Sequence, residues 1–491
     1  MTAPFADRLR GGIRPDTHKR ESGAAPLVAL PMPPELVIPL AQHKGPPAEA
    51  DVRAGDRVRA CEAVGRAAHP DSLAVHSPAS GVVRAVELRA VVHTDGEHKR
   101  QMCIVIETDG DAAAPRAPAP DWRDCSVDEI AARLRQSGVA GLGGAAFPSH
   151  RKLPLAGIPV HTVVINAAEC EPYITCDEAL MRHRPDEIVR GALVLSRLMG
   201  GAAPLLALED DKPEAAASVE AAARGTAVRI AIVPARYPVG AAHLLVYALT
   251  GIEIPAGRHA AEYGVQCFNV ATACAIHRAL DLGEPLARRV VTIAGRVARP
   301  QNVEAPIGTP LSVLLDHAGR LAGRMSYSVG GPLMGCPVDT LEAPVVKSTN
   351  CLLTLPTPER AERVMPCIRC ARCADACPVG LQPHDLWRFC RAGRTAKASE
   401  YGLAACIECG ACDYVCPSRI PLVAQFRVGK ASIAQEARSA AAAARSRERF
   451  EAHEKRVARA ESDALEPLEG ADDRVVQDAV RAALERARRP N

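Results

Sequence analysis

The 491-residue chain has few aromatic residues, little net charge and no long apolar run. Phe, Trp and Tyr make up only 3% of the residues, and the formal net charge is +3. Because a nucleic-acid track needs concentrated basic charge, this balance predicts no nucleic-acid partner. Residues 1–12 lack the apolar core of a signal peptide, and the most apolar stretch, 191–208, is interrupted by Arg197 and Pro204. We therefore expect neither signal-peptide export nor a membrane span.

Cysteine, in contrast, is abundant, and eight of the 18 cysteines fall into two runs of the same spacing. The runs are Cys367, Cys370, Cys373 and Cys377 followed by Pro378, and Cys406, Cys409, Cys412 and Cys416 followed by Pro417. The other ten cysteines are scattered without the spacing of a disulfide framework. This usage fits a reducing compartment better than secretion.

The spacing within the two runs predicts iron–sulfur clusters. Three thiolates at two-residue intervals can wrap one face of a 4Fe-4S cube, while the fourth, three residues on and followed by proline, ligates a second cube. The crossed ligand sets would be Cys367, Cys370, Cys373 and Cys416 for one cluster, and Cys406, Cys409, Cys412 and Cys377 for the other. A pair of structural zinc sites is the alternative, but it has no use for the third closely spaced cysteine or for the prolines.

The N-terminal part predicts an irregular leader and then a small β domain. Residues 1–35 are rich in Pro, Gly and charge, whereas residues 36–110 consist of short alternating runs separated by Gly, Pro and Asp. The order of segments 55–58 and 77–83 resembles the barrel-sandwich domains of biotinyl and lipoyl carriers. Because the segment between them, 66–76, has no lysine to modify, a scaffold module is favoured over a swinging-arm carrier. The Ala- and Pro-rich segment 111–120 then predicts a linker.

Strand and helix patterns alternate from residue 121 to residue 286. Ser126 and Glu129 form a capping box that opens a predicted helix ending near Gln136. Strand patterns follow at 161–165, 205–208 and 228–233, and helical patterns at 177–199 with a restart at Pro185, at 214–224 and at 241–249. This alternation predicts a parallel sheet covered by helices, in which ligands bind at the carboxyl ends of the strands.

Two segments of this region carry candidate binding residues. The first is a loop with Gly141, Gly143 and Gly144 followed by Lys152, which could cradle a phosphate but does not have the spacing of the dinucleotide fingerprint. A structural turn is therefore an equal alternative there. The second, residues 166–173, begins with Asn166 directly after a predicted strand and includes two carboxylates. Such groups are costly to bury without hydrogen bonds, and an exposed polar loop is the alternative.

The order of these segments resembles a known family. Segment 141–148 with Lys152, segment 166–172, the motif Tyr237-Pro-Val-Gly240 and segment 264–270 resemble the flavin- and NADH-binding subunit of respiratory complex I. With segment 330–335 and the doubled cysteine run added, the chain is more similar over nearly its whole length to the C subunits of the Rnf ion-translocating electron-transport complex.

The resemblance implies an FMN site. Gly141, Gly143, Gly144 and Lys152 would lie near the phosphate, and Asn166, Glu169 and Asn269 around the ribityl chain and ring. The other residues that the resemblance assigns to the cofactor site are Cys170, Glu171, Tyr237 and Gly240. NADH would stack on the flavin ring. Complex I subunits carry Glu residues soon after the Tyr-Gly motif, whereas this chain has Ala241-Ala242-His243, so those nicotinamide contacts do not carry over.

The implied architecture is multidomain α+β and α/β. The expected parts are a leader (1–35), a barrel-sandwich hybrid domain (36–110), a Rossmann-like α/β FMN/NADH-binding domain (121–286), a soluble-ligand-binding β-grasp domain (287–355), a ferredoxin-like domain with two 4Fe-4S clusters (356–430) and a helical or disordered tail (431–491). By resemblance, the protein would lie peripherally on the cytoplasmic face of the bacterial inner membrane. It would contact other Rnf subunits, integral membrane ones included, and link NAD(H) to ferredoxin.

Two other functions remain open from the sequence. The same modules occur in soluble cobalamin (corrin) reductases, which would need no membrane partner. A non-catalytic iron–sulfur electron conduit, whose flavin fold no longer binds a cofactor, would need no NADH. A flavin spectrum bleached by NADH separates the two enzymes from the conduit.

Overall fold

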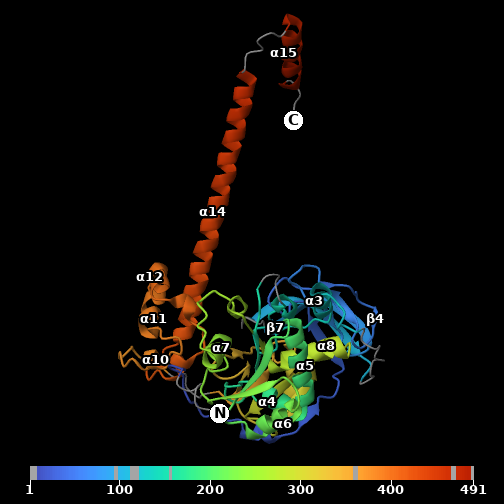
Figure 1. Ribbon diagram of the computed structural model, residues 1–491, viewed down its shortest axis with the longest axis vertical. Coiled ribbons are helices and arrows are strands. Elements are labelled where there is room, and N and C mark those ends of the chain that lie inside the picture. The colour runs from blue at the N-terminus through green and yellow to red at the C-terminus, as the bar shows by residue number, and fades with distance from the viewer. Residues whose placement is uncertain are drawn as a thin grey trace. The chain divides into compact units, whose positions relative to one another are not determined.

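The computed structural model describes residues 8–92, 98–110, 121–153, 158–357, 363–465 and 472–487. The chain divides into a unit ending at Arg427 and a C-terminal unit that begins at Val428 (Figure 1). The predicted linker 111–120 lies outside the described residues. Among the described helices, none is long and apolar enough to cross a membrane.

The first module is built of two small antiparallel sheets around an apolar core. One sheet has the order β2-β8-β7-β4 and the other the order β3-β5-β6. Their strands are β2 (Glu35–Pro39), β3 (Glu49–Ala50), β4 (Arg57–Val58), β5 (Ala63–Arg66), β6 (Val75–His76), β7 (Gly81–Val92) and β8 (His98–Thr108). Alternate residues such as Leu36, Ile38, Ile104 and Ile106 are buried between the sheets, which is the pattern that the alternating sequence predicted.

The α/β module contains the predicted parallel sheet, with strand order β11-β10-β9-β12. The strands are β9 (Thr162–Asn166), β10 (Ala203–Glu209), β11 (Arg229–Val233) and β12 (Val265–Asn269). The helices are α3 (Val127–Gln136), α4 (Cys176–His183), α5 (Pro185–Leu198), α6 (Pro213–Ala223), α7 (Ala242–Thr250) and α8 (Val270–Asp281), with short 3-10 turns η1 (Ser149–Lys152) and η2 (Ala260–Tyr263). The capping box of Ser126 and Glu129 is formed, and Pro185 begins α5. Helices α5 and α8 lie side by side (Figure 1).

A six-stranded sheet, ordered β1-β14-β13-β17-β15-β16, forms the third module. It contains β1 (Leu27–Ala29), β13 (Arg288–Gly295), β14 (Gln301–Pro306), β15 (Met325–Val329), β16 (Cys336–Pro337) and β17 (Cys351–Pro356), with α9 (Leu311–Ala318) packed on it.

The leader is less irregular than its composition predicted. Residues 20–24 form the short helix α2 (Arg20–Ala24), and β1 pairs in parallel with β14 of the third module. The amide of Asn302 donates to the carbonyl of Ser22, which fixes α2 against that sheet. A three-residue strand between prolines is too short to show an alternating pattern, so no local signal pointed to it.

The cysteine runs occupy a small helical module whose two halves repeat one backbone. Its elements are α10 (Arg372–Asp375), α11 (Pro383–Arg391), α12 (Thr395–Glu400), η3 (Leu403–Ala405) and α13 (Ala411–Tyr414). Each run turns through two left-handed residues, Arg369 and Ala371 in the first and Glu408 and Gly410 in the second. The sequence repeat is thus also a repeat of backbone conformation.

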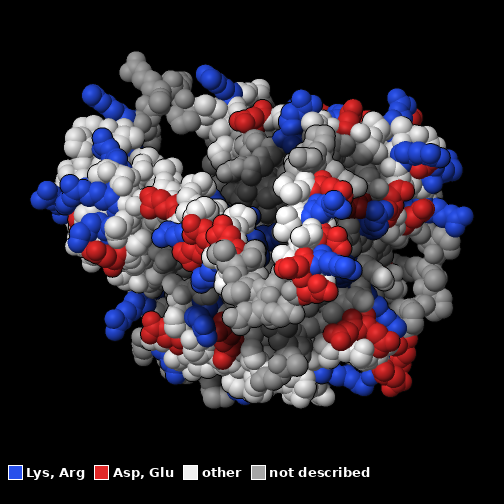
Figure 2. All heavy atoms as spheres, turned by 90° about the horizontal axis from the view of Figure 1, so that it is seen from above, with Lys and Arg blue, Asp and Glu red and all other residues white. Residues whose placement is uncertain are grey.

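Two helices form most of the described chain after the cysteine runs. The helices are α14 (Leu422–Leu465) and α15 (Asp473–Ala487), so α14 begins nine residues before residue 431, where the tail was expected to start. Figure 2 shows basic and acidic side chains intermixed over the face in view. That face therefore carries no broad patch of one sign among the residues drawn in colour.

Candidate functional site

Three neighbouring strands of the parallel sheet each end in a polar residue. Asn166 ends β9, Glu209 ends β10 and Asn269 ends β12, and in the strand register Asn166 lies opposite Asn269. Because the strands are parallel, all three side chains lie at the same carboxyl edge. The structure thus places two predicted residues, Asn166 and Asn269, together where such sheets bind ligands.

Asn269 and Glu169 hold the N-termini of two helices at this edge. The side-chain oxygen of Asn269 accepts from the amides of Ala271 (3.0 Å) and Thr272 (3.3 Å), while its amide group donates to Asp177 (2.6 Å). The buried carboxylate of Glu169 accepts from the amides of Asp177 (2.9 Å) and Glu178 (3.3 Å) at the start of α4. Carboxylates are favourable there because the helix N-terminus carries partial positive charge.

Asp177 is the most strongly perturbed carboxyl group at this edge. Burial, together with the nearby charge of Glu169, raises the pKa of Asp177 to about 7. One oxygen atom of Asp177 also lies within 4.8 Å of a carboxylate oxygen of Glu169. Asp177 can therefore hold a proton near neutral pH.

The glycine loop packs against the same edge. A Cβ atom on Gly143 would lie 3.1 Å from the Cβ of Asn269, so only glycine fits without displacement. Gly144 has φ of 95° and would meet nothing within 4 Å. Gly141 donates its amide to the Phe147 carbonyl (2.8 Å), which closes the loop. The loop therefore brings backbone groups close to Asn269 while leaving open space beside Gly144.

Lys152 lies in η1, shortly after this loop, and is half-buried. Its ammonium group donates to the carbonyl of Cys267 (2.8 Å) and lies 5.1 Å from the centroid of the Phe268 ring. Burial lowers the pKa of Lys152. An ammonium group has three donors, and one carbonyl satisfies only one of them, so an anionic group next to it would be stabilising.

The remaining predicted residues lie close around Asn166. Its amide donates to the carbonyl of Gly240 (2.8 Å), and its oxygen accepts from Ala168 (3.1 Å). A Cβ atom on Gly240 would lie 2.4 Å from the carbonyl oxygen of Ala168 and 3.3 Å from the sulfur of Cys170. Burial raises the pKa of the Cys170 thiol. This corner of the site is thus tightly packed around a neutral thiol.

Glu171 joins the α/β module to the glycine-rich segment 330–335. Its carboxylate accepts from the amides of Leu333 (2.7 Å) and Met334 (3.0 Å). A Cβ atom on Gly331 would lie 2.1 Å from the Glu171 side chain, so this contact requires glycine. Although burial raises its pKa, Glu171 has its hydrogen bonds within the protein, and we assign it a structural role at the edge of the site.

Tyr237 connects the α/β module directly to the second cysteine run. Its hydroxyl group donates to the backbone carbonyl of Cys409, and its amide donates to Ile13 (3.0 Å). Tyr237, Ile13, Cys409 and Ala411 pack in one apolar cluster. The motif that the sequence assigned to the flavin domain therefore touches a predicted cluster ligand.

One group of four cysteines and one pair have the arrangement that crossed ligation predicts. Cys377, from the first run, lines one small cavity with Cys406, Cys409 and Cys412 from the second. Cys416, from the second run, lies near Cys373 of the first, since burial and the neighbouring Cys416 both raise the pKa of Cys373. Cys367 and Cys370 are exposed. Four converging thiols supply the donor set that a 4Fe-4S cube requires, so the first group fits that cofactor.

Two charged groups at the site were missed from the sequence. Lys19 in the leader is buried and donates to the backbone carbonyl of Glu169, and Glu209 pairs with the buried Lys212 while accepting from the Glu169 amide (3.0 Å). Glu209 comes directly after the predicted strand 205–208, and this position is the signal that could have identified it. No local pattern pointed to Lys19, because its partner lies 150 residues away.

Family models match four consecutive parts of the chain. They are the RnfC barrel sandwich hybrid domain (residues 7–111), the Nuo51 FMN-binding domain (134–278), the SLBB domain (290–337) and the 4Fe-4S dicluster domain (366–421). The chain therefore has an FMN-binding domain and a domain for two 4Fe-4S clusters, in the order that its motifs predicted.

Curated relatives extend the similarity to almost the whole chain. The C subunit of the ion-translocating oxidoreductase complex of Serratia proteamaculans is 41% identical over 98% of this chain and 69% of the relative. The corresponding protein of Pectobacterium atrosepticum is 42% identical over 98% of this chain and 70% of the relative, and that of Erwinia tasmaniensis 42% identical over 91% and 56%. The chain thus spans between 56% and 70% of the length of these relatives.

A solved NAD+-reducing [NiFe]-hydrogenase matches 64% of the chain at 21% identity with a TM-score of 0.46, which is too low to carry an inference. The family models and the curated relatives agree with one another. The chain belongs to the family of C subunits of ion-translocating oxidoreductase complexes.

Proposed function

We propose that the chain transfers electrons between NAD(H) and ferredoxin through FMN and two 4Fe-4S clusters, as one subunit of an ion-translocating complex. In this proposal it lies peripherally on the cytoplasmic face of the bacterial inner membrane and contacts other subunits of the complex, integral membrane ones included. Its family membership supports the complex, and the order of its domains supports the electron path.

The observation that carries the proposal is the contact between Tyr237 and Cys409. Because the Tyr237 hydroxyl group donates to the Cys409 carbonyl, the flavin module and the cluster module meet without an intervening layer of protein. The contact between Glu171 and the segment with Leu333 adds a second junction, since Leu333 also packs against Gly410. Electron transfer needs such proximity between carriers.

The proposed FMN site is the carboxyl edge of the parallel sheet. Gly141, Gly143, Gly144 and Lys152 would hold the phosphate, because they combine close backbone approach with a buried ammonium group. Asn166, Glu169 and Asn269 would orient the ribityl chain and ring, and Cys170, Glu171, Tyr237 and Gly240 would form the surrounding wall. Bound FMN would supply a carrier that accepts two electrons as hydride and releases them singly to one-electron carriers.

This chain's own residues would mainly bind, orient and exclude water. The hydrogen bonds of Asn166 and Asn269 fix the two strand ends, and the tightly packed Gly240 and Cys170 close one side. Asp177 can hold a proton at the same edge, given its pKa of about 7. No acid, base or nucleophile of the protein is needed for hydride transfer itself.

The proposed cluster ligands are the two crossed sets. Cys406, Cys409, Cys412 and Cys377 would hold the cluster beside Tyr237, and Cys367, Cys370, Cys373 and Cys416 would hold the other. We also propose the domain division 1–35, 36–110, 121–286, 287–355, 356–430 and 431–491, with the amendment that β1 of the leader completes the sheet of the third domain.

Anaerobic measurement of iron, sulfide and flavin tests this function. About eight irons and one flavin per chain are expected, since each set of four cysteines holds one four-iron cube. NADH should then bleach the flavin spectrum. A colourless chain containing zinc would overturn the proposal, and co-purification with integral membrane proteins tests the place in a complex.

A further inference from the structure

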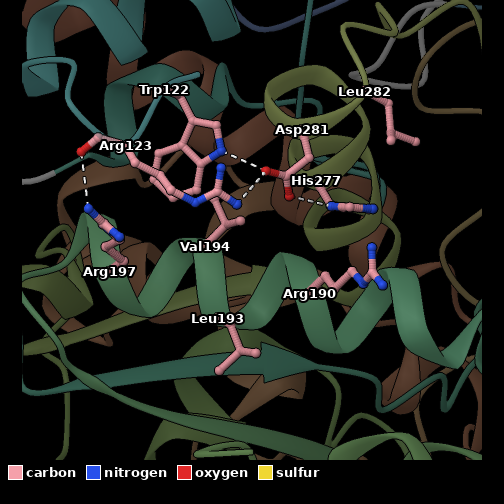
Figure 3. Close-up of a pocket in the computed structure, with 9 residues that line it drawn as sticks. All are labelled: Trp122, Arg123, Arg190, Leu193, Val194, Arg197, His277, Asp281 and Leu282. Atoms are coloured by element: carbon pink, nitrogen blue, oxygen red, sulfur yellow. Dashed lines mark hydrogen bonds and ion pairs between the residues drawn. The ribbon is translucent and has the colours of Figure 1, made fainter. Parts of the chain in front are cut away.

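The hollow drawn in Figure 3 lies within the α/β module, and polar side chains around it bond to one another. Asp281 on α8 accepts from the indole nitrogen of Trp122 (2.7 Å) and from Nδ1 of His277 (2.7 Å). Arg197 on α5 donates to the backbone carbonyl of Arg123 (3.1 Å). These contacts join α5 and α8 to the segment before α3, so they hold one module together. The contacts of the leader, in contrast, join different modules.

Residues 9–19 of the leader, here called the strap, are bound at one end to the motif that contains Tyr237. The carbonyl of Leu9 accepts from the Arg236 guanidinium (3.0 Å). The amide of Ile13 donates to the Tyr237 carbonyl (2.8 Å), and the Tyr237 amide donates back to the Ile13 carbonyl (3.0 Å). This pair of bonds is an antiparallel bridge. The strap is thus fixed to the same motif that contacts the second cysteine run.

The next part of the strap lies against a proposed cluster ligand. The amide of Gly12 donates to the carbonyl of Ala376 (2.9 Å), the residue before Cys377. Gly11 has φ of 57°, and a Cβ atom there would lie 2.3 Å from the carbonyl oxygen of Cys377. A Cβ atom on Gly12, at φ of 77°, would lie 2.7 Å from the carbonyl oxygen of Tyr237. Both neighbours are backbone atoms that cannot rotate away, so the close approach of the two modules requires glycine at both positions.

The other end of the strap is held at the proposed FMN site. The Tyr173 amide donates to the Thr17 carbonyl (2.8 Å), and the rings of His18 and Tyr173 are stacked with centroids 4.6 Å apart. The buried Lys19 donates to the backbone carbonyl of Glu169. His18 and Tyr173 both have left-handed backbones, with φ of 49° and 68°. Such conformations are costly for residues with side chains and persist only where the surrounding contacts hold them. This end is therefore fixed beside Glu169.

The length of the strap limits the separation of its two attachment points. Gly12 and Lys19 are seven residues apart in the sequence. Because a fully extended chain gains at most 3.6 Å per residue, the two backbones can be at most about 25 Å apart. The strap therefore restricts how far the backbone beside Cys377 can move from the FMN edge.

We propose that the strap is a positioning element for electron transfer, which fixes the cluster of Cys377, Cys406, Cys409 and Cys412 relative to the FMN edge. The inference rests on the proposed electron path. In that path NADH is oxidised to NAD+, its two electrons pass one at a time to the two clusters, and the proton of the hydride goes to solvent. A strap that only stabilised the fold would leave the rate of this transfer unchanged in a chain that still binds flavin and iron.

Anaerobic rapid mixing of the flavin- and cluster-loaded chain with NADH, monitored at flavin and cluster wavelengths, tests the proposal. Gly11→Ala should leave flavin bleaching unchanged. It should slow cluster reduction about tenfold or more, because displacements of about 1 Å have effects of that size on reactions that depend on position. Gly225→Ala is the matched control, since Gly225 also has a left-handed backbone (φ of 74°) but no described atom within 4 Å of its Cβ position. It should leave both rates unchanged.

A second variant separates the position of the modules from an effect on the cluster itself. Gly12→Ala meets the Tyr237 carbonyl rather than the cysteine, and it should slow the same step while flavin bleaching stays unchanged. Arg236→Ala, which removes only the bond to the Leu9 carbonyl, should slow that step less. Iron and flavin contents report whether each variant is loaded, and Arg236→Ala decides the question if neither glycine variant is.

Two results would overturn the proposal. One is unchanged cluster reduction in the loaded variants, even if their free energy of unfolding falls. The other is slowing in Gly11→Ala but not in Gly12→Ala, which would place the effect in the cluster ligand. Failure of the proposed function would look different, because NADH would then fail to bleach the flavin or to reduce the clusters in the unchanged chain.

Discussion

The two cysteine runs share spacing, proline and backbone conformation, yet they lie in different surroundings. Cys409 and Cys412 are only 7% and 8% exposed and share an apolar cavity with Leu386 and Phe426. Cys367 and Cys370 are exposed, and Ile368 between them is 67% exposed. A sequence repeat thus determines the local backbone, while the neighbouring modules determine which copy is buried.

The difference suggests an order for the electron path. The group of Cys377, Cys406, Cys409 and Cys412 lies beside Tyr237, so it is placed to exchange electrons with the flavin. The exposed Cys367 and Cys370, from the other ligand set, are placed to exchange electrons with a partner protein. We therefore predict that the buried end serves the flavin and the exposed end serves the partner, and the following experiments test that comparison.

Substitution of single cysteines should have the largest effect, because it changes both iron content and cluster reduction by NADH. Cys377→Ser and Cys416→Ser should each remove about four irons, because each residue completes one cube. With crossed ligation, Cys377→Ser loses the cluster beside Tyr237, so NADH should no longer reduce the remaining one. Cys416→Ser should leave the cluster beside Tyr237 reducible. Rapid mixing with NADH, followed by electron paramagnetic resonance, separates the two variants, and the reverse result would show uncrossed ligation.

Iron release should also differ between the two ends. Cys367 and Cys370 are exposed, whereas Cys409 and Cys412 of the other ligand set are buried. An iron chelator should therefore remove iron in two phases of equal amplitude, and the cluster held by Cys367 and Cys370 should lose its iron first. Absorbance of the iron–chelator complex gives the rates. The Cys416→Ser variant should lack the fast phase. A single phase in the unchanged chain would contradict the comparison.

At the proposed FMN site, Asp177 should make the free energy of unfolding depend on pH. Its pKa in the folded protein is about 7 against an ordinary value of 3.8, so the folded state binds more protons between these values. The free energy of unfolding should therefore fall as pH rises from about 4 to 7, by at most a few kcal/mol from this group. Asp177→Asn should lack that slope. Denaturant unfolding of the flavin-free chain measures it, and parallel pH profiles of the two proteins would count against a raised pKa of Asp177.

The smallest effect is expected at the Tyr237 contact between the α/β module and the cysteine module. Tyr237→Phe removes the donor to the Cys409 carbonyl, which should cost about 1 to 2 kcal/mol of unfolding free energy. Tyr263→Phe is the control, because no hydrogen bond of its hydroxyl group is recorded among the described residues. Electron transfer from flavin to cluster should slow in Tyr237→Phe alone. Equal behaviour of the two variants would remove Tyr237 from the path.

Local signals in the sequence predicted much of this structure. The capping box of Ser126, the restart at Pro185 and the alternation of strands and helices depend on neighbouring residues, and all are present. The family resemblance assigned Asn166 and Asn269 to one site, and the strand register places the two residues opposite each other. In contrast, the position of Lys19 and the pairing of β1 depend on contacts between distant segments, which periodicity cannot reveal.

The most direct test of the electron path is anaerobic single-turnover mixing of the chain with NADH, monitored at flavin and cluster wavelengths. We predict that the flavin bleaches first, that cluster reduction follows, and that a flavin-free preparation shows neither change. Cluster reduction by NADH without flavin, or flavin bleaching with no cluster reduction, would contradict the account.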